Sequence, residues 1–71
     1  MMVNDPRGET AYVSQDVLDG IESLANSGVN ILAPGQMSEM ALKFGYPEVY
    51  NYIQENVADY IKGATGTFAL K

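Results

Sequence analysis

Three acidic side chains, spaced three residues apart, are the first candidates for chemistry in this sequence. Asp16, Asp19 and Glu22 fall in a segment with helical periodicity, so they share one face, and no Lys or Arg lies among them. Catalytic carboxylates need a concave, partly desolvated site, which nothing in the sequence indicates. The set predicts either a solvated face with acids near a helix N-terminus, or a docking surface for a Lys- and Arg-rich partner.

The residue types that most often carry catalysis or bind metals are missing. The 71 residues include no Cys and no His, which excludes disulfides and thiolate metal sites and removes the commonest metal ligand and general base. The segment from Asp16 to Gly20 also lacks the alternating oxygen ligands of an EF-hand. We therefore expect a protein that is not an enzyme and that needs no cofactor and no metal.

Aromatic side chains are the second set of candidates. Tyr46 and Tyr52 lie beside the apolar stripe of the segment at 47–62, and Phe68 belongs to an apolar run at the end of the sequence. Tyr is enriched at interface hot spots, because it offers a large rigid surface and a polar tip. Tyr46 and Tyr52 predict a partner-binding patch close to Met37 or Met40, and Phe68 predicts a contact made by the apolar end of the sequence; the alternative is that the tyrosines complete a small core.

Composition and charge limit the class of partner. The hydrophobic content of 46% indicates a folded domain, and the net charge of −5 favours a basic partner surface, or serves solubility alone. Direct contact with nucleic acid or an anionic membrane is disfavoured, because both require Lys and Arg. No apolar run is long enough to span a membrane, and Met1 to Arg7 lacks signal-peptide features, so we expect a cytoplasmic protein, in the host cytoplasm if viral.

The elements that must position these residues are mainly helical. Apolar spacing and capping residues predict helices at about 15–26, 36–44 and 47–62, the last with an apolar stripe at Val49, Ile53 and Val57. Gly63 is expected to close that helix, and Gly20 to mark a close contact between helices. The fold class is therefore mainly α: a compact three-helix single domain over 1–71.

The two ends of the chain have a weaker pattern. Residues 1–8 are expected to be flexible, and residues 10–13 have the composition of a short strand. Residues 64–71 are expected to be flexible; within them, 67–70 would be either a strand pairing with 10–13 in a two-stranded ribbon, or a tail that orders on binding.

The step between the second and third predicted helices resembles the helix-turn-helix of small repressors over about 20 residues. Ala41 and Gly45 have the spacing of the small residue and the turn glycine in that motif. The resemblance implies DNA binding, with Asn51 and Gln54 available to read adenine edges. After Gly45 the apolar register departs from the motif, which also suits an ordinary helical hairpin.

The function that these observations favour is a non-catalytic protein–protein binding module. By analogy with other small acidic proteins, it would be a regulator or inhibitor, of a phage or mobile-element kind, of a larger enzyme or nucleic-acid machine. The alternatives are a divergent helix-turn-helix DNA-binding regulator and a small structural subunit that assembles into a homo-oligomer. Asp16, Asp19, Glu22, Tyr46, Tyr52 and Phe68 are the residues expected to contact the partner.

Overall fold

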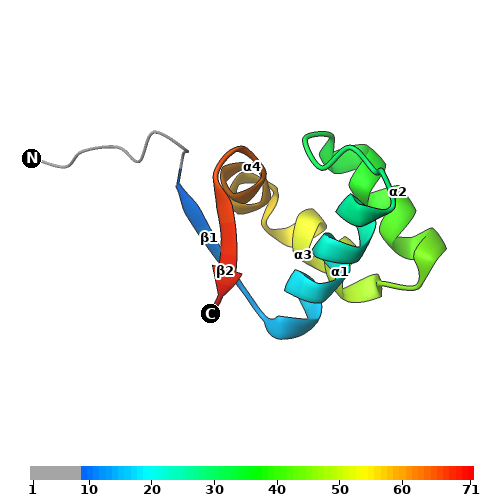
Figure 1. The fold of residues 1–71 in the computed structure, drawn as a ribbon, viewed down its shortest axis with the longest axis horizontal. Coiled ribbons are helices and arrows are strands. Elements are labelled where there is room, and N and C mark those ends of the chain that lie inside the picture. Colours follow the sequence, from blue (N-terminus) through cyan, green and yellow to red (C-terminus); the bar gives the residue numbers. More distant parts are fainter. Residues whose placement is uncertain (1–8) are drawn as a thin grey trace, which may run out of the picture.

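The computed structural model describes residues 9–71, which form four helices between two short strands (Figure 1). In chain order the elements are β1 (Thr10–Val13), α1 (Gln15–Asn26), α2 (Pro34–Phe44), α3 (Pro47–Glu55), α4 (Val57–Thr65) and β2 (Thr67–Leu70). The mainly α, compact architecture with a ribbon formed near the chain ends is confirmed. The expected flexibility of residues 1–8 concerns a segment outside the described residues.

The two strands pair in parallel, with Ala11 beside Phe68 and Val13 beside Leu70. Parallel strands require a crossover, which here consists of all four helices. Residues 67–70 are thus a strand, which is one of the two alternatives for this segment, and residues 64 and 65 belong to α4. The strand forms because β1 turns Ala11 and Val13 toward the core and Phe68 has a ring to bury there.

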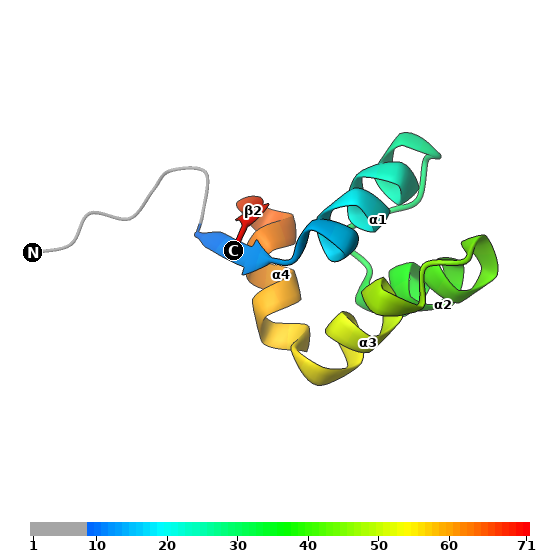
Figure 2. The same ribbon diagram turned by 90° about the horizontal axis from the view of Figure 1, so that it is seen from below.

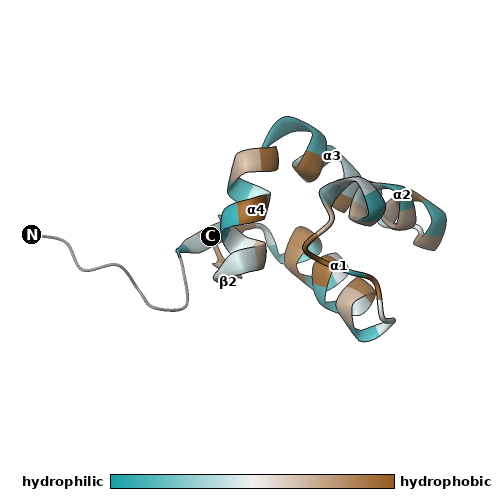
Figure 3. Cartoon of the chain, turned by 90° about the horizontal axis from the view of Figure 1, so that it is seen from above, coloured by the Kyte–Doolittle hydropathy of each residue, from teal (hydrophilic) through white to brown (hydrophobic). Residues whose placement is uncertain are grey.

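The core lies where one face of each helix meets the others. Leu24, Met37, Ala41, Val49 and Tyr60 are fully buried. In α1 the buried positions Val17, Ile21 and Leu24 recur at four- and three-residue spacing, and Figure 3 shows hydrophobic and hydrophilic bands alternating along this helix. The predicted boundaries of α1, 15–26, match those observed, and a glycine with positive φ, Gly28, follows its end.

The long helix predicted at 47–62 is wrong, because the chain breaks at Asn56 into α3 and α4. Figure 2 shows the sharp change of direction between the two helices. Asn56 has φ −139° and ψ 49°, outside the helical region. Its N–H donates the last hydrogen bond of α3, to the Tyr52 carbonyl, and its own carbonyl accepts the first hydrogen bond of α4, from Tyr60 N–H. Of the predicted stripe, Val49 and Ile53 are buried, whereas Val57 is 47% exposed.

Two glycines allow close packing between elements. A Cβ added to Gly20 on α1 would lie 2.5 Å from Val49 Cγ2 and 3.3 Å from Tyr46 Cδ1, so the expected close contact between helices is confirmed. A Cβ added to Gly63 would collide with the ring of Phe68. Gly63 therefore does not close α4, which continues to Thr65; it provides the flat surface on which Phe68 packs.

Among residues 9–71, no helix is both long and apolar enough to cross a membrane.

Candidate partner-binding cleft

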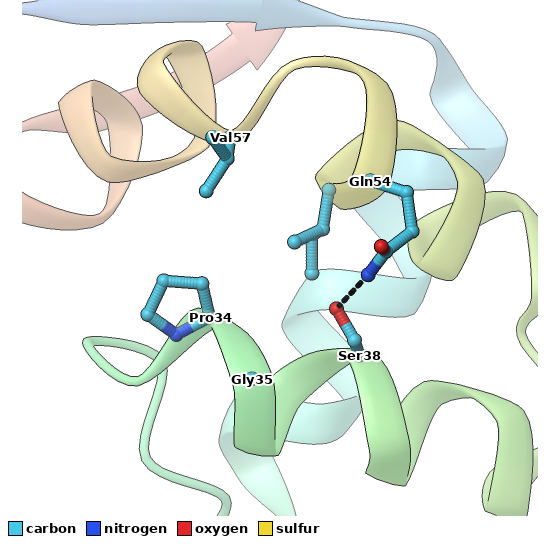
Figure 4. A pocket seen from close by; sticks show the side chains of 6 residues that line it. Pro34, Gly35, Ser38, Gln54 and Val57 are labelled. Atoms are coloured by element: carbon cyan, nitrogen blue, oxygen red, sulfur yellow. Dashed lines mark hydrogen bonds between the residues drawn. The ribbon is translucent and has the colours of Figure 1, made fainter.

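An open cleft of about 290 Å³ lies between the start of α2 and the junction of α3 with α4 (Figure 4). It is lined by Pro34, Gly35, Ser38, Ile53, Gln54 and Val57. None of these side chains is ionisable, so the cleft has no group that could act as a general acid, base or charged nucleophile. What it offers is mostly apolar surface.

Two helix starts form the walls of the cleft. Pro34 occupies the first position of α2, where its missing N–H costs nothing and its ring can face outward. Val57 begins α4 directly after the break at Asn56. Figure 4 shows Pro34 and Val57 facing each other across the opening. The cleft thus depends on the break, because it is there that Val57 leaves the core and becomes 47% exposed.

Two polar atoms of the cleft are paired with each other. Gln54 Nε2 donates a hydrogen bond of 3.2 Å to Ser38 Oγ, which Figure 4 marks on one side of the opening. Ser38 is buried, at 4% exposed, and the bond ties α2 to α3. A ligand would not have to supply a partner for these atoms, so its natural contact is an apolar group against Pro34, Ile53 and Val57.

The charged residues that adjoin the cleft in sequence are acidic. Glu39 follows Ser38, and Glu55 follows Gln54; both are exposed. The nearest cation on α4, Lys62, lies 3.7 Å from Asp59, with which it forms an exposed ion pair. These acids, together with the net negative charge of the chain, favour a ligand that carries positive charge beside its apolar part.

The acids of α1 lie on another part of the molecule. Asp16, Asp19 and Glu22 are exposed, as predicted for a solvated or docking face, and no Lys of residues 9–71 forms an ion pair with them. Asp19 accepts a 2.8 Å hydrogen bond from Gln15 Nε2. Figure 4 shows α1 behind α2 and α3, so the cleft opens away from the helix that carries these acids.

The aromatic candidates lie against the core. Tyr46 is half-buried and packs close to Gly20, and Phe68 is half-buried with its ring centroid 5.4 Å from that of Tyr60. Tyr52 is half-buried as well, and Met37 beside the expected patch is fully buried. The three aromatic side chains thus pack partly into the core while each keeps some accessible surface, and partner binding by them stays a prediction.

Two tyrosine hydroxyls have opposite environments. Tyr60 Oη donates a 2.6 Å hydrogen bond to the carbonyl of Ile31, which ties α4 to the loop before α2, and burial raises the pKa of Tyr60 well above its usual value. Tyr52 Oη is buried and has no hydrogen-bond partner among the described residues. Burial, and then the negative charge of Asp59, raise the pKa of Tyr52.

The turn of the motif that resembles a helix-turn-helix is present. Gly45 has φ 87°, a left-handed conformation that ends α2, and Tyr46 N–H bonds to the Ala41 carbonyl. Asn51 and Gln54 are both exposed on α3, and Gln54 donates a hydrogen bond to Ser38. DNA binding by this pair of helices stays a prediction.

No local pattern in the sequence predicts the cleft. Its walls come from positions about 20 residues apart, and only tertiary packing brings such positions together. The available signal was Asn56, a poor helix former between two apolar periods, and Pro34-Gly35 ahead of a helical pattern. Within residues 9–71, no group of three or more acids is arranged to hold a metal ion.

Comparison of the chain with protein-family models, with curated proteins and with solved structures found no match.

Proposed function

We propose that this protein is a non-catalytic protein-binding module, whose cleft between α2 and the α3–α4 junction receives an apolar side chain from a basic segment of its partner. The observation that carries the proposal is the cleft itself: an open, mostly apolar hollow with no ionisable lining. Two of its lining residues, Ser38 and Gln54, are each followed in the sequence by an exposed acid. A hollow of this kind suits an anchor residue, because binding hot spots are often aromatic side chains held in well-packed pockets.

The size of the cleft favours a side chain over a metabolite. Its volume of about 290 Å³ is at the lower limit of the range of roughly 300–1,000 Å³ that is typical of small-molecule sites. It is open rather than enclosed by the chain, so a ligand would remain partly exposed unless the partner covered it. A single anchor side chain fits the small volume of the cleft, and the folded or helical partner that carries it would cover the open side.

The net charge of the chain should affect the rate at which a partner associates more than the affinity of the complex. The chain carries a net charge of −5, and the acids of α1, Glu39 and Glu55 are all exposed. A basic partner would be attracted from any direction, and Glu39 and Glu55 would then help to orient it. The role of such a module as regulator or inhibitor of a larger enzyme or nucleic-acid machine remains a prediction.

The test is selection from a random peptide library displayed on phage, with the purified protein as bait. We expect the enriched peptides to share one apolar residue flanked by Lys or Arg. The decisive variant is Gly35→Leu, because a Cβ at Gly35 meets nothing within 4 Å and the added side chain would occupy the cleft without disturbing the core. The variant should lose most of the affinity for the selected peptides, by about tenfold or more.

Ala25→Leu is the matched control. Ala25 is exposed near the end of α1, so this variant adds a similar side chain to a helix away from the cleft and should bind as the wild type does. If the selected peptides bind Gly35→Leu with unchanged affinity, or if no peptide is enriched, the cleft is not the binding site.

A further inference from the structure

The parallel ribbon has one edge that no described element covers. α4 packs across both strands and α1 packs against β2. In Figure 1 no described element lies beyond β1 on the side away from β2. A strand edge of this kind exposes unpaired N–H and C=O groups and is a template for another strand.

The hydrogen bonds of the ribbon identify the free groups. The carbonyl of Glu9 accepts from Thr67 N–H and that of Val13 from Lys71 N–H. Since the backbone groups of successive residues point to opposite sides of a strand, Ala11 also faces β2, and the N–H and C=O of Thr10 and Tyr12 point away from it. Nothing in residues 9–71 bonds these groups.

We infer that β1 pairs with β1 of a second copy of this chain, in antiparallel orientation about a two-fold axis at Ala11, to form a four-stranded sheet. In this register Thr10 of each chain lies opposite Tyr12 of the other, and the two residues exchange both of their hydrogen bonds. The free groups of β1 are therefore self-complementary without a shift of register. The small side chain of Ala11 leaves the axis uncrowded.

The side chains of β1 agree with a second copy as the occupant. The buried face, Ala11 and Val13, would continue across the axis as one apolar surface. On the outer face the ring of Tyr12, which is 62% exposed, would lie beside Thr10 of the other chain. Such a pair of an aromatic and a β-branched residue is among those that stabilise antiparallel sheets.

Charge at the ends of the sheet is complementary. The paired segment, 10–13, carries no charged residue. Glu9 of one chain would lie level with Val13 of the other, and Lys71 lies just beyond Val13 on β2. Opposite charges thus come to the same end of the sheet, two strands or about 10 Å apart. A two-stranded sheet is marginal and a chain of this size gains from oligomerisation, which a second copy would provide.

Sedimentation velocity of the full chain, from micromolar to millimolar concentration, tests the pairing. We expect a concentration-dependent shift from the mass of one chain, 7.7 kDa, to that of two. Tyr12→Pro should stay monomeric, because it removes an N–H that only the second copy uses, and proline is tolerated at such an outward edge position. Tyr12→Thr keeps the N–H and a β-branched side chain, and should still dimerise.

A pair of cysteine variants tests the register independently of any proline effect on folding. Thr10→Cys and Tyr12→Cys chains, mixed in a glutathione redox buffer, should form mixed disulfide dimers above the statistical share. Their Cα atoms would be about 5.5 Å apart, within the range for a disulfide. A wild type that is monomeric at all concentrations, a dimer that persists in Tyr12→Pro, or the absence of excess mixed disulfide would each overturn the inference. None of these outcomes concerns the cleft, which has its own variant, Gly35→Leu.

Discussion

At the scale of single residues, Tyr52 and Tyr60 show that the same buried hydroxyl can stabilise or destabilise a fold. Both hydroxyls are removed from water, but Tyr60 Oη has the Ile31 carbonyl as its acceptor and Tyr52 Oη has no partner among the described residues. A satisfied buried hydrogen bond contributes to stability, whereas an unsatisfied polar atom opposes it. The two positions therefore give opposite expectations for one substitution.

Tyr60→Phe should lower the free energy of unfolding by about 1–3 kcal/mol, because it leaves the Ile31 carbonyl without its donor. Tyr52→Phe should leave stability unchanged or raise it, because it removes a polar atom that has no partner. Urea unfolding of the two variants beside the wild type measures both effects. A Tyr52→Phe variant less stable than Tyr60→Phe would contradict this interpretation.

The same two hydroxyls predict a loss of stability in alkali. Both folded-state pKa values are raised above the ordinary value of about 10 for an exposed Tyr, so the folded protein holds these protons more tightly than the unfolded chain does. The stabilisation is complete below about pH 10 and is lost as the pH rises toward the folded-state pKa values. Urea unfolding from about pH 8 to about pH 11 should show this decline, and it should be smaller in Tyr60→Phe. If the stability of Tyr60→Phe fell with pH as steeply as that of the wild type, titratable groups other than Tyr60 would cause the loss.

At the scale of elements, the junction of α1 with α3 depends on a missing side chain. Gly20 lies inside α1, where Ala would favour the helix by roughly 1 kcal/mol. The Cβ of Ala would lie 2.5 Å from Val49 Cγ2, however, and Val49 is fully buried. We expect Gly20→Ala to destabilise the protein by about 1–3 kcal/mol despite the gain in propensity, because the core must shift.

Thermal unfolding measures this effect, and Gly35→Ala is its matched control. Gly35 also lies within a helix, but an added Cβ meets nothing within 4 Å, so this variant should keep or gain stability. If both variants gained stability, the close contact between α1 and α3 would be absent in solution.

How much of the fold the sequence predicts differs between elements. Local signals define α1: Ser14 before it, one apolar stripe, and Gly28 after it. The break at Asn56 escaped prediction because Val57 and Ile61 continue the helical period past it, and both proved 46–47% exposed. The prediction for Gly63 was wrong for a related reason, since its role depends on tertiary packing against the ring of Phe68, a residue of β2.

The candidate site was predicted less well than the fold. Exposure of the α1 acids follows from their helical spacing, and the structure places them on the surface as expected. The cleft, in contrast, depends on Pro34 and Val57 facing each other from separate helices, which no local pattern encodes. Tyr46, Tyr52 and Phe68 have the composition of a binding patch, but the same rings fill a small core.

At the scale of the whole molecule, charge separates the two proposed interactions. Each chain carries −5, so two copies repel each other, and added salt should strengthen the β1 pairing by screening. Attraction between the acidic chain and a basic peptide should weaken with salt for the same reason. Sedimentation and peptide affinity measured over one salt series would show these opposite trends; parallel trends would mean that one interface does not have the proposed chemistry.

The acids of α1 allow a further comparison of surfaces. Replacing Asp16 and Asp19 by Asn and Glu22 by Gln should change the free energy of unfolding by no more than about 1 kcal/mol, because all three are exposed. The triple α1 variant should lose less peptide affinity than the double variant Glu39→Gln with Glu55→Gln. These two acids directly follow the cleft-lining residues Ser38 and Gln54 in the sequence. If the α1 variant lost more affinity, α1 would be the docking face, as one interpretation of the sequence predicts.

Nuclear magnetic resonance with isotope-labelled protein and a selected basic peptide tests the central proposal most directly. We predict that the methyl signals of Ile53 and Val57 and the backbone amides of Gly35 and Ser38 shift on titration, while the amides from Asp16 to Glu22 stay nearly unchanged. Shifts concentrated on α1, with the cleft signals unmoved, would contradict the assignment of the cleft as the partner-binding site.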